Sequence, residues 1–269
     1  MTTPRPLAGR PAIVTGAGRG IGLAIATELA ALGASVALLG RTEEKLREAA
    51  GQLTDAFDGT HTTAHGQHAI AIACDVTDDA SVAAACAEAA RRLGDIYLLV
   101  NNAGTAPAAG ILEITREEWD TAFDVNVTGA WRCVRCVVPG MITRGEGRII
   151  QVASTAGLKG YAGVSAYVAA KHALVGFTRA LALELGPKGI TVNAVCPGYT
   201  NTDIARQAID NLVSARGLTP DEARAKLTRH NPSGRLVEPH EVASVVGWLS
   251  LPESGSITGQ AIAVAGGEI

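Results

Sequence analysis

The sequence predicts an α/β fold in which a parallel, doubly wound sheet is flanked by helices. Short apolar runs rich in Ala, Val and Ile recur along the 269 residues, and helix-like stretches separate them. No linker or internal repeat divides the chain. Strands that alternate with helices in this way form a right-handed parallel sheet. We therefore expect one domain over residues 1–269.

Composition and charge exclude several classes of protein. The net charge is −3, which gives no reason to expect a nucleic-acid partner. Residues 1–6 lack the apolar stretch of a secretion signal, and no apolar run reaches the length of a membrane span. The five cysteines are scattered, as is typical of reduced thiols. We expect a cytoplasmic enzyme without a membrane partner.

Two patterns could be taken for metal sites. Cys133-x-x-Cys136 falls within an apolar helical run, 129–141, with no second ligand pair near it in sequence. His61, His65 and His68 lie in a polar stretch, 55–68, that reads as a surface loop. We interpret the cysteines as packing residues and expect no metal site.

The first strand leads into a glycine-rich loop. An apolar run over 11–15 is followed at once by Gly-Ala-Gly-Arg-Gly-Ile-Gly (16–22) and by a helical pattern over 23–32. Strand, glycine loop and helix are the context of a dinucleotide-binding loop, since glycines let the backbone approach a pyrophosphate. A purely structural turn is the alternative. The residues expected to contact the cofactor here are Gly16, Arg19, Gly20, Ile21 and Gly22.

The second strand, 34–39, favours NADP(H) over NAD(H). An acidic residue after this strand would accept the ribose 2′-hydroxyl and repel a 2′-phosphate. The chain has Arg41 there, and Arg19 in the glycine loop could form a second side of a phosphate clamp. Two solvated arginines are the alternative.

The middle of the chain continues the alternation. The expected elements are a helix over 43–53, a strand over 69–74, a helix ending at Leu93 that Asp78 or Asp79 caps, a strand over 96–100 and a helix from Arg116. Small residues and amides follow the fourth strand (101–104), which suits close approach of a cofactor. Asn126 falls inside the apolar helical pattern, so it is either a core amide bonded to the backbone or a functional group.

A candidate acid–base pair follows the fifth strand, 148–153. Ser154 lies in the turn after this strand, and Tyr167 and Lys171 lie four residues apart at the start of a helix over 166–185. Such a pair shares one helix face. An ammonium about 5 Å away favours the phenolate by roughly 3 kcal/mol, about two pKa units. The pattern indicates proton transfer to or from a carbonyl or alcohol oxygen.

The last part of the chain contains a long excursion. A strand over 189–195 is followed by residues 199–235, which read as two short helices, 203–214 and 219–229. An excursion of this length is usually functional, and we interpret it as a lid. Its arginines would suit an anionic substrate, although a solvated face explains them as well. A helix over 238–249 and a strand over 260–264 complete the pattern.

Taken together, these motifs resemble the classical short-chain dehydrogenase/reductase family over about residues 8–269. The matching positions are Thr15-Gly16-x-x-x-Gly20-Ile21-Gly22, Asp75, Asn101-Asn102-Ala103-Gly104, Asn126, Ser154, Tyr167-x-x-x-Lys171 and Pro197-Gly198. The resemblance implies a Rossmann fold with seven parallel strands. It also implies a homotetramer built partly on the helices around 115–140 and 164–186.

The resemblance also implies residue roles. Tyr167 would be the general acid/base, Lys171 would lower its pKa and hold the nicotinamide ribose, and Ser154 would orient the carbonyl. Asn126 would hold a water for a proton relay. Further cofactor contacts are implied for Asp75, Val76, Asn102, Ala103, Gly104, Pro197, Gly198, Thr200 and Thr202.

Within the family, the run 165–178 and the stretch 191–198 resemble 3-oxoacyl reductases and type II polyketide ketoreductases. The sequence therefore predicts an NADPH-dependent ketoreductase acting on a small-molecule ketone, such as a 3-oxoacyl thioester of CoA or of a carrier protein. The alternative is an NAD-dependent secondary-alcohol or 3-hydroxyacyl-CoA dehydrogenase. A sensor that binds the cofactor without catalysis is disfavoured because Asn126, Ser154, Tyr167 and Lys171 are all present.

Overall fold

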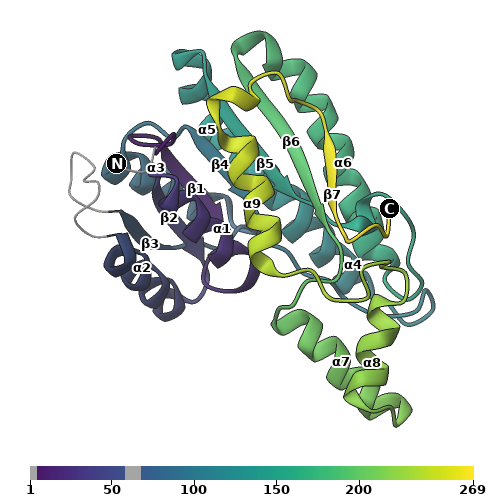
Figure 1. Cartoon of the computed structure of the whole chain (residues 1–269). Helices are drawn as coiled ribbons and strands as arrows, with labels where there is room; N and C mark the ends of the chain where they lie inside the picture. Colours follow the sequence, from purple (N-terminus) through teal and green to yellow (C-terminus); the bar gives the residue numbers. More distant parts are fainter. Residues whose placement is uncertain (1–4, 58–67) are drawn as a thin grey trace.

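Seven parallel strands form one sheet in the order β3-β2-β1-β4-β5-β6-β7 (Figure 1). The structure is a computed structural model that describes residues 5–57 and 68–269. Its strands are β1 Pro11–Thr15, β2 Ser35–Gly40, β3 Ala69–Ala73, β4 Leu98–Asn101, β5 Gly147–Val152, β6 Ile190–Pro197 and β7 Ala261–Val264. The predicted α/β fold with a seven-stranded parallel sheet is confirmed.

Helices cover both faces of the sheet. They are α1 Gly20–Ala31, α2 Glu43–Phe57, α3 Asp79–Leu93, α4 Arg116–Phe123, α5 Gly129–Arg144, α6 Ser165–Leu185, α7 Asp203–Arg216, α8 Pro220–Thr228 and α9 Pro239–Ser250. Side chains alternate across each strand, so Ala12 and Val14 pack with α1, α2 and α9, whereas Ile13 packs with α3, α5 and α6. The apolar side chains packed on the two faces of the sheet hold the strands in register. The site lies at the carboxyl ends of these strands.

Several element boundaries differ from the sequence-based prediction. Helix α1 begins at Gly20 rather than Leu23, so the last glycines of the loop belong to the helix. Residues 124–128, expected to continue an ordinary helix, form a π-helical turn between α4 and α5. Residues 55–57 extend α2, and the predicted loop over 58–67, with His61 and His65, lies outside the described residues. His68 is buried rather than on the surface, and its carbonyl accepts the Val36 N–H at the start of β2–β3 pairing.

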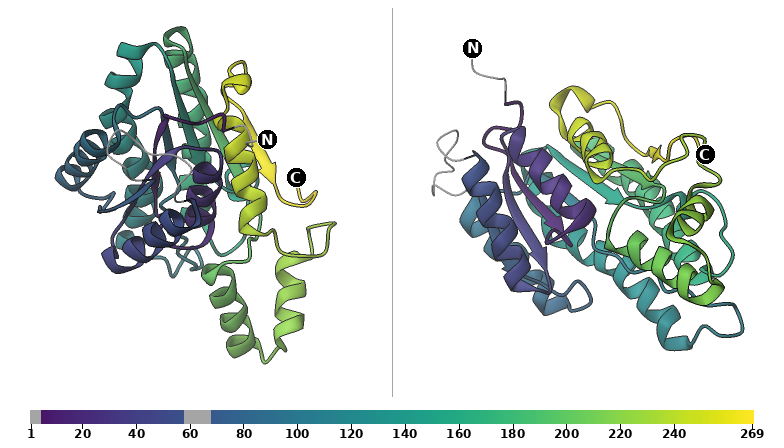
Figure 2. Two further views of the ribbon diagram at one scale, coloured as in Figure 1. Left: turned by 60° about the vertical axis from the view of Figure 1, so that its left-hand side comes forward. Right: turned by 60° about the horizontal axis from the view of Figure 1, so that its bottom comes forward.

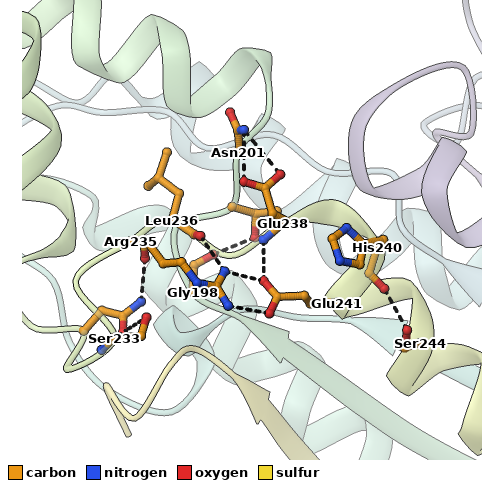
Figure 3. Close-up of polar contacts among 11 residues, drawn as sticks. Gly198, Asn201, Ser233, Arg235, Leu236, Glu238, His240, Glu241 and Ser244 are labelled. Carbon is orange, nitrogen blue, oxygen red and sulfur yellow. Dashed lines mark hydrogen bonds and ion pairs between the residues drawn. The ribbon is translucent and has the colours of Figure 1, made fainter.

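Helices α7 and α8 form a helical hairpin that projects from the body of the molecule (Figures 1 and 2). The hairpin leaves the sheet at the end of β6 and returns through a bridge between Thr200 and Val237. Figure 3 shows the contacts at its base, where Asn201 donates to Glu238 and Arg235 forms two hydrogen bonds with Glu241. The excursion is therefore attached to the first turn of α9.

The cysteines are free thiols. Cys133 is fully buried, as predicted for a packing residue, whereas Cys136 is exposed, so its interpretation as a packing residue is wrong. Within residues 5–57 and 68–269, no group of His, Cys, Asp or Glu is arranged to hold a metal ion. The same residues include no helix long and apolar enough to cross a membrane.

Candidate active site

The site lies at the carboxyl edge of the sheet, where the glycine-rich loop after β1 passes the end of β4. Gly16 has a φ of +65°, a left-handed conformation that favours glycine. A Cβ atom at Gly22 would lie 2.3 Å from the Gly16 carbonyl oxygen. Only glycine fits there, so the first turn of α1 can close onto the loop.

Hydrogen bonds from the end of β4 hold this loop. The Thr15 hydroxyl oxygen accepts the backbone N–H groups of Asn102 and Ala103 at 2.9 and 3.0 Å. The Asn102 side-chain amide donates to the carbonyls of Thr15 and Gly16 at 2.9 and 3.2 Å. The Asn102 amide nitrogen thus supports the loop, and only its oxygen is left for the ribose contact that the resemblance implies.

The N-terminus of α1 fits an anionic ligand. Arg19 is the N-cap residue and its side chain caps no N–H group, and the first turn of α1 contains no acidic residue. Uncapped N–H groups at a helix N-terminus favour a phosphate. Thr202 lies against the loop, since a Cβ at Gly20 would be 3.4 Å from its methyl carbon. These residues fit the pyrophosphate of a dinucleotide.

The adenosine end of the expected cofactor site contains Arg41 and Asp75. Arg41 is exposed directly after β2. The Asp75 carboxylate accepts the Thr77 N–H at 2.9 Å and the Thr77 hydroxyl at 2.7 Å, and these bonds lower the pKa of Asp75. Arg19 differs from expectation, because it forms an ion pair with Asp203 of α7 at 3.3 Å. The two arginines are therefore not a free clamp, and Arg41 is the one available to a 2′-phosphate.

Ser154, Tyr167 and Lys171 converge beyond the end of β5. The Ser154 hydroxyl oxygen accepts the Ala156 N–H at 3.0 Å, which fixes its position, and Ser154 acts to lower the pKa of the neighbouring Tyr167 phenol. The Lys171 ammonium donates to the Val152 carbonyl at 2.9 Å and lies 5.7 Å from the centre of the Tyr167 ring. The three predicted groups therefore lie together, with Lys171 buried.

The predicted lowering of the Tyr167 pKa is wrong for the chain alone. Burial raises the pKa of Tyr167 above 10, and the hydrogen bond from Ser154 only partly offsets this effect. Burial also lowers the pKa of Lys171 from 10.5 to about 8. An i, i+4 spacing reveals the charge of Lys171 beside the phenol but not the desolvation that both groups share.

Asn126 lies in the π-helical turn and faces the same space. Its side-chain amide donates to the carbonyls of Thr105 and Ala122, both at 2.8 Å. Its buried amide oxygen has no partner among the described residues. A Cβ at Gly104 would lie 2.8 Å from that oxygen and 3.6 Å from the Lys171 ammonium. The amide nitrogen is therefore bonded to the backbone, as the core-amide alternative predicts, and the oxygen is available to a donor such as a water, so a functional role of Asn126 stays a prediction.

The sequence analysis missed a polar cluster beside Ser154. Tyr161 and Lys159, from the segment after β5, contact Glu268, from the segment after β7. Nothing in the sequence marks this contact, because residues 159–161 and 268 lie on separate loops that only the parallel order of β5, β6 and β7 brings together. A lone Glu after the last strand gives no signal of its own.

The family follows from these features and from comparison with known proteins. A family model described as short chain dehydrogenase matches residues 10–212. The chain therefore belongs to the short-chain dehydrogenase family, as the sequence predicted. It is a nicotinamide-dependent oxidoreductase that acts on CH–OH or ketone groups.

Several similar proteins are ketoreductases. A Streptomyces virginiae protein, whose name marks it as a candidate ketoacyl reductase of the monensin polyketide synthase, is 44% identical, with 96% of each chain covered. The 3-oxoacyl-[acyl-carrier-protein] reductase FabG of Vibrio cholerae is 36% identical, with 97% of this chain and 98% of FabG covered. A crystal structure of a tryptophan variant of the actinorhodin polyketide ketoreductase with NADPH is 37% identical, has a TM-score of 0.90, and each chain is covered over 99%.

Proposed function

We propose that this enzyme reduces a ketone with NADPH, and that the ketone is a 3-oxoacyl thioester or a related polyketide-type ketone. The observation that carries the proposal is the convergence of the Tyr167 phenol, the Ser154 hydroxyl and the buried Lys171 ammonium. The names of the relatives support the substrate class, and the NADPH in the actinorhodin ketoreductase structure supports the cofactor.

The side chains have distinct tasks in this reaction. When bound, the nicotinamide cofactor supplies the hydride and, once oxidised, a positive charge. Ser154 donates a hydrogen bond to the substrate carbonyl and holds it beside the phenol. Tyr167 then gives its proton to the carbonyl oxygen as hydride reaches the carbon. The raised pKa of Tyr167 suits this direction, because the phenol stays protonated near neutral pH until the substrate takes the proton.

The phenolate that remains needs a proton for the next turnover. Lys171 and Ser154 stabilise it, the first by charge and the second by a hydrogen bond. The unpaired oxygen of Asn126 and the Lys171 ammonium both border the space beside Gly104, which provides a position for a water that carries the proton onward. Lys171, with a pKa of about 8, can gain and lose a proton within the working range of pH.

Replacing Tyr167 with Phe tests the central role. Tyr167→Phe removes only the hydroxyl, so kcat should fall by a factor of about 10³ or more while NADPH still binds. The measurement is NADPH oxidation with a panel of 3-oxoacyl thioesters and aryl ketones, with NADPH binding followed by fluorescence. A variant that kept more than about a tenth of wild-type kcat would remove Tyr167 from the mechanism.

The cofactor preference has its own test. Arg41 is exposed at the end of β2, where a 2′-phosphate would add a charge-assisted contact. Arg41→Ala should raise the KM for NADPH about tenfold and leave the KM for NADH nearly unchanged. Equal changes would contradict the 2′-phosphate contact and favour the NAD-dependent dehydrogenase alternative. The match to a D-beta-hydroxybutyrate dehydrogenase of Cupriavidus necator, 36% identical, keeps that alternative open to test.

A further inference from the structure

We propose that Glu268 is a positioning residue for Ser154 and for the substrate side of the site. This inference rests on the proposed function, because it concerns the placing of the hydroxyl that orients the carbonyl. Glu268 would act through Tyr161 and Thr155, which lead from the segment after β7 to the residue next to Ser154. It would touch neither substrate nor cofactor.

The Glu268 carboxylate is buried between two partners. Its side chain is 4% exposed. One carboxylate oxygen lies 2.6 Å from the Tyr161 hydroxyl and 2.9 Å from the Lys159 ammonium. A buried carboxylate is costly unless it is paired and hydrogen bonded, so this arrangement holds the segment that carries both partners firmly in place.

The direction of the hydrogen bonds links Glu268 to the catalytic turn. A carboxylate only accepts, so the single Tyr161 hydroxyl proton goes to Glu268. The Thr155 hydroxyl, 2.7 Å from the Tyr161 oxygen, must then donate to it. The pKa of Tyr161 is consistent with this order, because burial and the bond to Glu268 raise it whereas the bond to Thr155 lowers it. Thr155 is buried and directly follows Ser154.

Glu268 and the segment before it also contact the end of β6 and the base of the α7–α8 excursion. Its second carboxylate oxygen lies next to Gly198, since a Cβ there would be 3.3 Å away. The Gly198 N–H donates to the Val264 carbonyl at 3.0 Å, and the Ser233 N–H donates to the Gly266 carbonyl at 3.3 Å. The segment 264–268 therefore joins the turn after β5, the end of β6 and the base of the α7–α8 excursion. Loosening Glu268 should release the turn that places Ser154.

The charge balance has a consequence for the substrate. Glu268 neutralises Lys159 through an ion pair at 2.9 Å, and the same carboxylate accepts the Tyr161 hydroxyl. On the Glu268 side of the turn, the pairing leaves the Tyr161 ring rather than a free Lys159 charge. The ketone should therefore present a neutral, apolar or aromatic group to this wall.

The test compares Glu268→Gln, Tyr161→Phe and the double variant with wild type. Gln keeps the shape and an acceptor but loses the charge, so we expect kcat to fall about tenfold while the KM and dissociation constant for NADPH change less than about twofold. The kcat of the double variant should be no lower than that of the more affected single variant, because both substitutions break the same chain of hydrogen bonds. Glu268→Asp, which keeps the charge, should recover part of kcat. Glu253→Gln is the control, since Glu253 is exposed beyond α9 and near Tyr97 at the opposite edge of the sheet.

A second measurement does not depend on turnover. Hydrogen–deuterium exchange of residues 154–161 should be faster in Glu268→Gln than in wild type, with the exchange of β1 and α1 unchanged. Unchanged kcat and unchanged exchange in Glu268→Gln, or additive effects in the double variant, would overturn the inference. Turnover by Tyr167→Phe would instead overturn the proposed function, so the two failures are distinguishable.

Discussion

At the scale of single residues, Lys171 shows that the candidate site has a cost in stability. Its ammonium is buried and, among the described residues, donates one hydrogen bond, to the Val152 carbonyl at 2.9 Å. A lone carbonyl does not replace the hydration that the charge loses, and the pKa of Lys171 falls to about 8. The charged form is therefore destabilised in the folded chain without cofactor.

This feature predicts a pH effect on stability with a definite sign. Between pH 8 and 10.5 the unfolded chain binds the Lys171 proton more strongly than the folded chain, so the free energy of unfolding rises with pH in this window. This gain in the free energy of unfolding is lost again as pH falls to 8. Between pH 7.5 and 9.5, wild type should gain about 2 kcal/mol relative to Lys171→Met.

Urea unfolding of both proteins without cofactor, at the two pH values, measures this difference. The variant serves as the control for the tyrosines and cysteines that titrate in the same range. If the free energies of the two proteins changed in parallel with pH, the lowered pKa of Lys171 would be wrong.

Single residues also show the limit of prediction from sequence. The spacing of Tyr167 and Lys171 and the turn after β5 were enough to place three functional groups together. The pKa of Tyr167 was not predictable, because it depends on how much water the surrounding strands remove. Glu268 was not predictable either, since its partners come from another loop.

At the scale of elements, the base of the α7–α8 excursion depends on one bidentate ion pair (Figure 3). Arg235 donates to both carboxylate oxygens of Glu241 at 2.7 Å, and the Glu238 N–H also donates to this carboxylate. These contacts lower the pKa of Glu241 from 4.5 to about 2, with Arg235 as the largest cause. They fix the angle at which the excursion returns to α9.

We expect Glu241→Gln to destabilise this base by about 1 kcal/mol at neutral pH, since the pair is partly exposed. The substrate KM should rise more than the KM for NADPH. The carboxylate stabilises the fold above pH 4.5, and this stability is lost as pH falls toward 2. Melting temperatures of variant and wild type should therefore differ at pH 7 and converge as the medium is acidified.

Glu238→Gln is the matched control for that experiment. The Glu238 side chain accepts from Asn201 at 3.2 and 3.3 Å and takes part in the capping box of α9, but among the described residues it has no bidentate arginine partner, so its replacement should have a smaller effect. An equal loss of stability in the two variants would show that the bidentate pair does not hold the base.

Elements were predictable where one periodicity dominates. Strand β1 and the last residue of α6 lie where the apolar pattern placed them. The start of α1 was missed because a glycine run has no periodicity, although glycines are tolerated where a loop turns into a helix. The π-helical turn at 124–128 was also missed, because one extra residue in a turn leaves the apolar pattern on both sides unchanged.

At the scale of the whole molecule, large apolar side chains remain exposed on the helices. Leu183 of α6 is 82% exposed, and Trp131 of α5 and Trp248 of α9 are 39% and 47% exposed. The family resemblance places subunit contacts of a tetramer partly on the helices around 115–140 and 164–186. Exposed apolar groups of this size on such helices are typical of an interface.

Leu183→Glu tests that assembly. A charge within a packed subunit contact is costly, so the variant should dissociate into smaller species while its circular dichroism stays that of wild type. Light scattering after size exclusion measures the mass. Glu44→Lys, on the exposed face of α2 outside the expected contacts, is the control and should leave the mass unchanged. A Leu183→Glu protein with the wild-type mass would exclude this surface from the interface.

The order of strands in the sheet has a consequence for the growing polypeptide. Strands β2 and β3 can join β1 as soon as residue 73 is made, but the other side of β1 pairs only with β4, which ends at Asn101. Until the ribosome has supplied β4, that side of β1 presents unpaired backbone N–H and C=O groups between apolar side chains. Chains halted before residue 98 should therefore aggregate, and the nascent protein should need a chaperone at this stage of its synthesis.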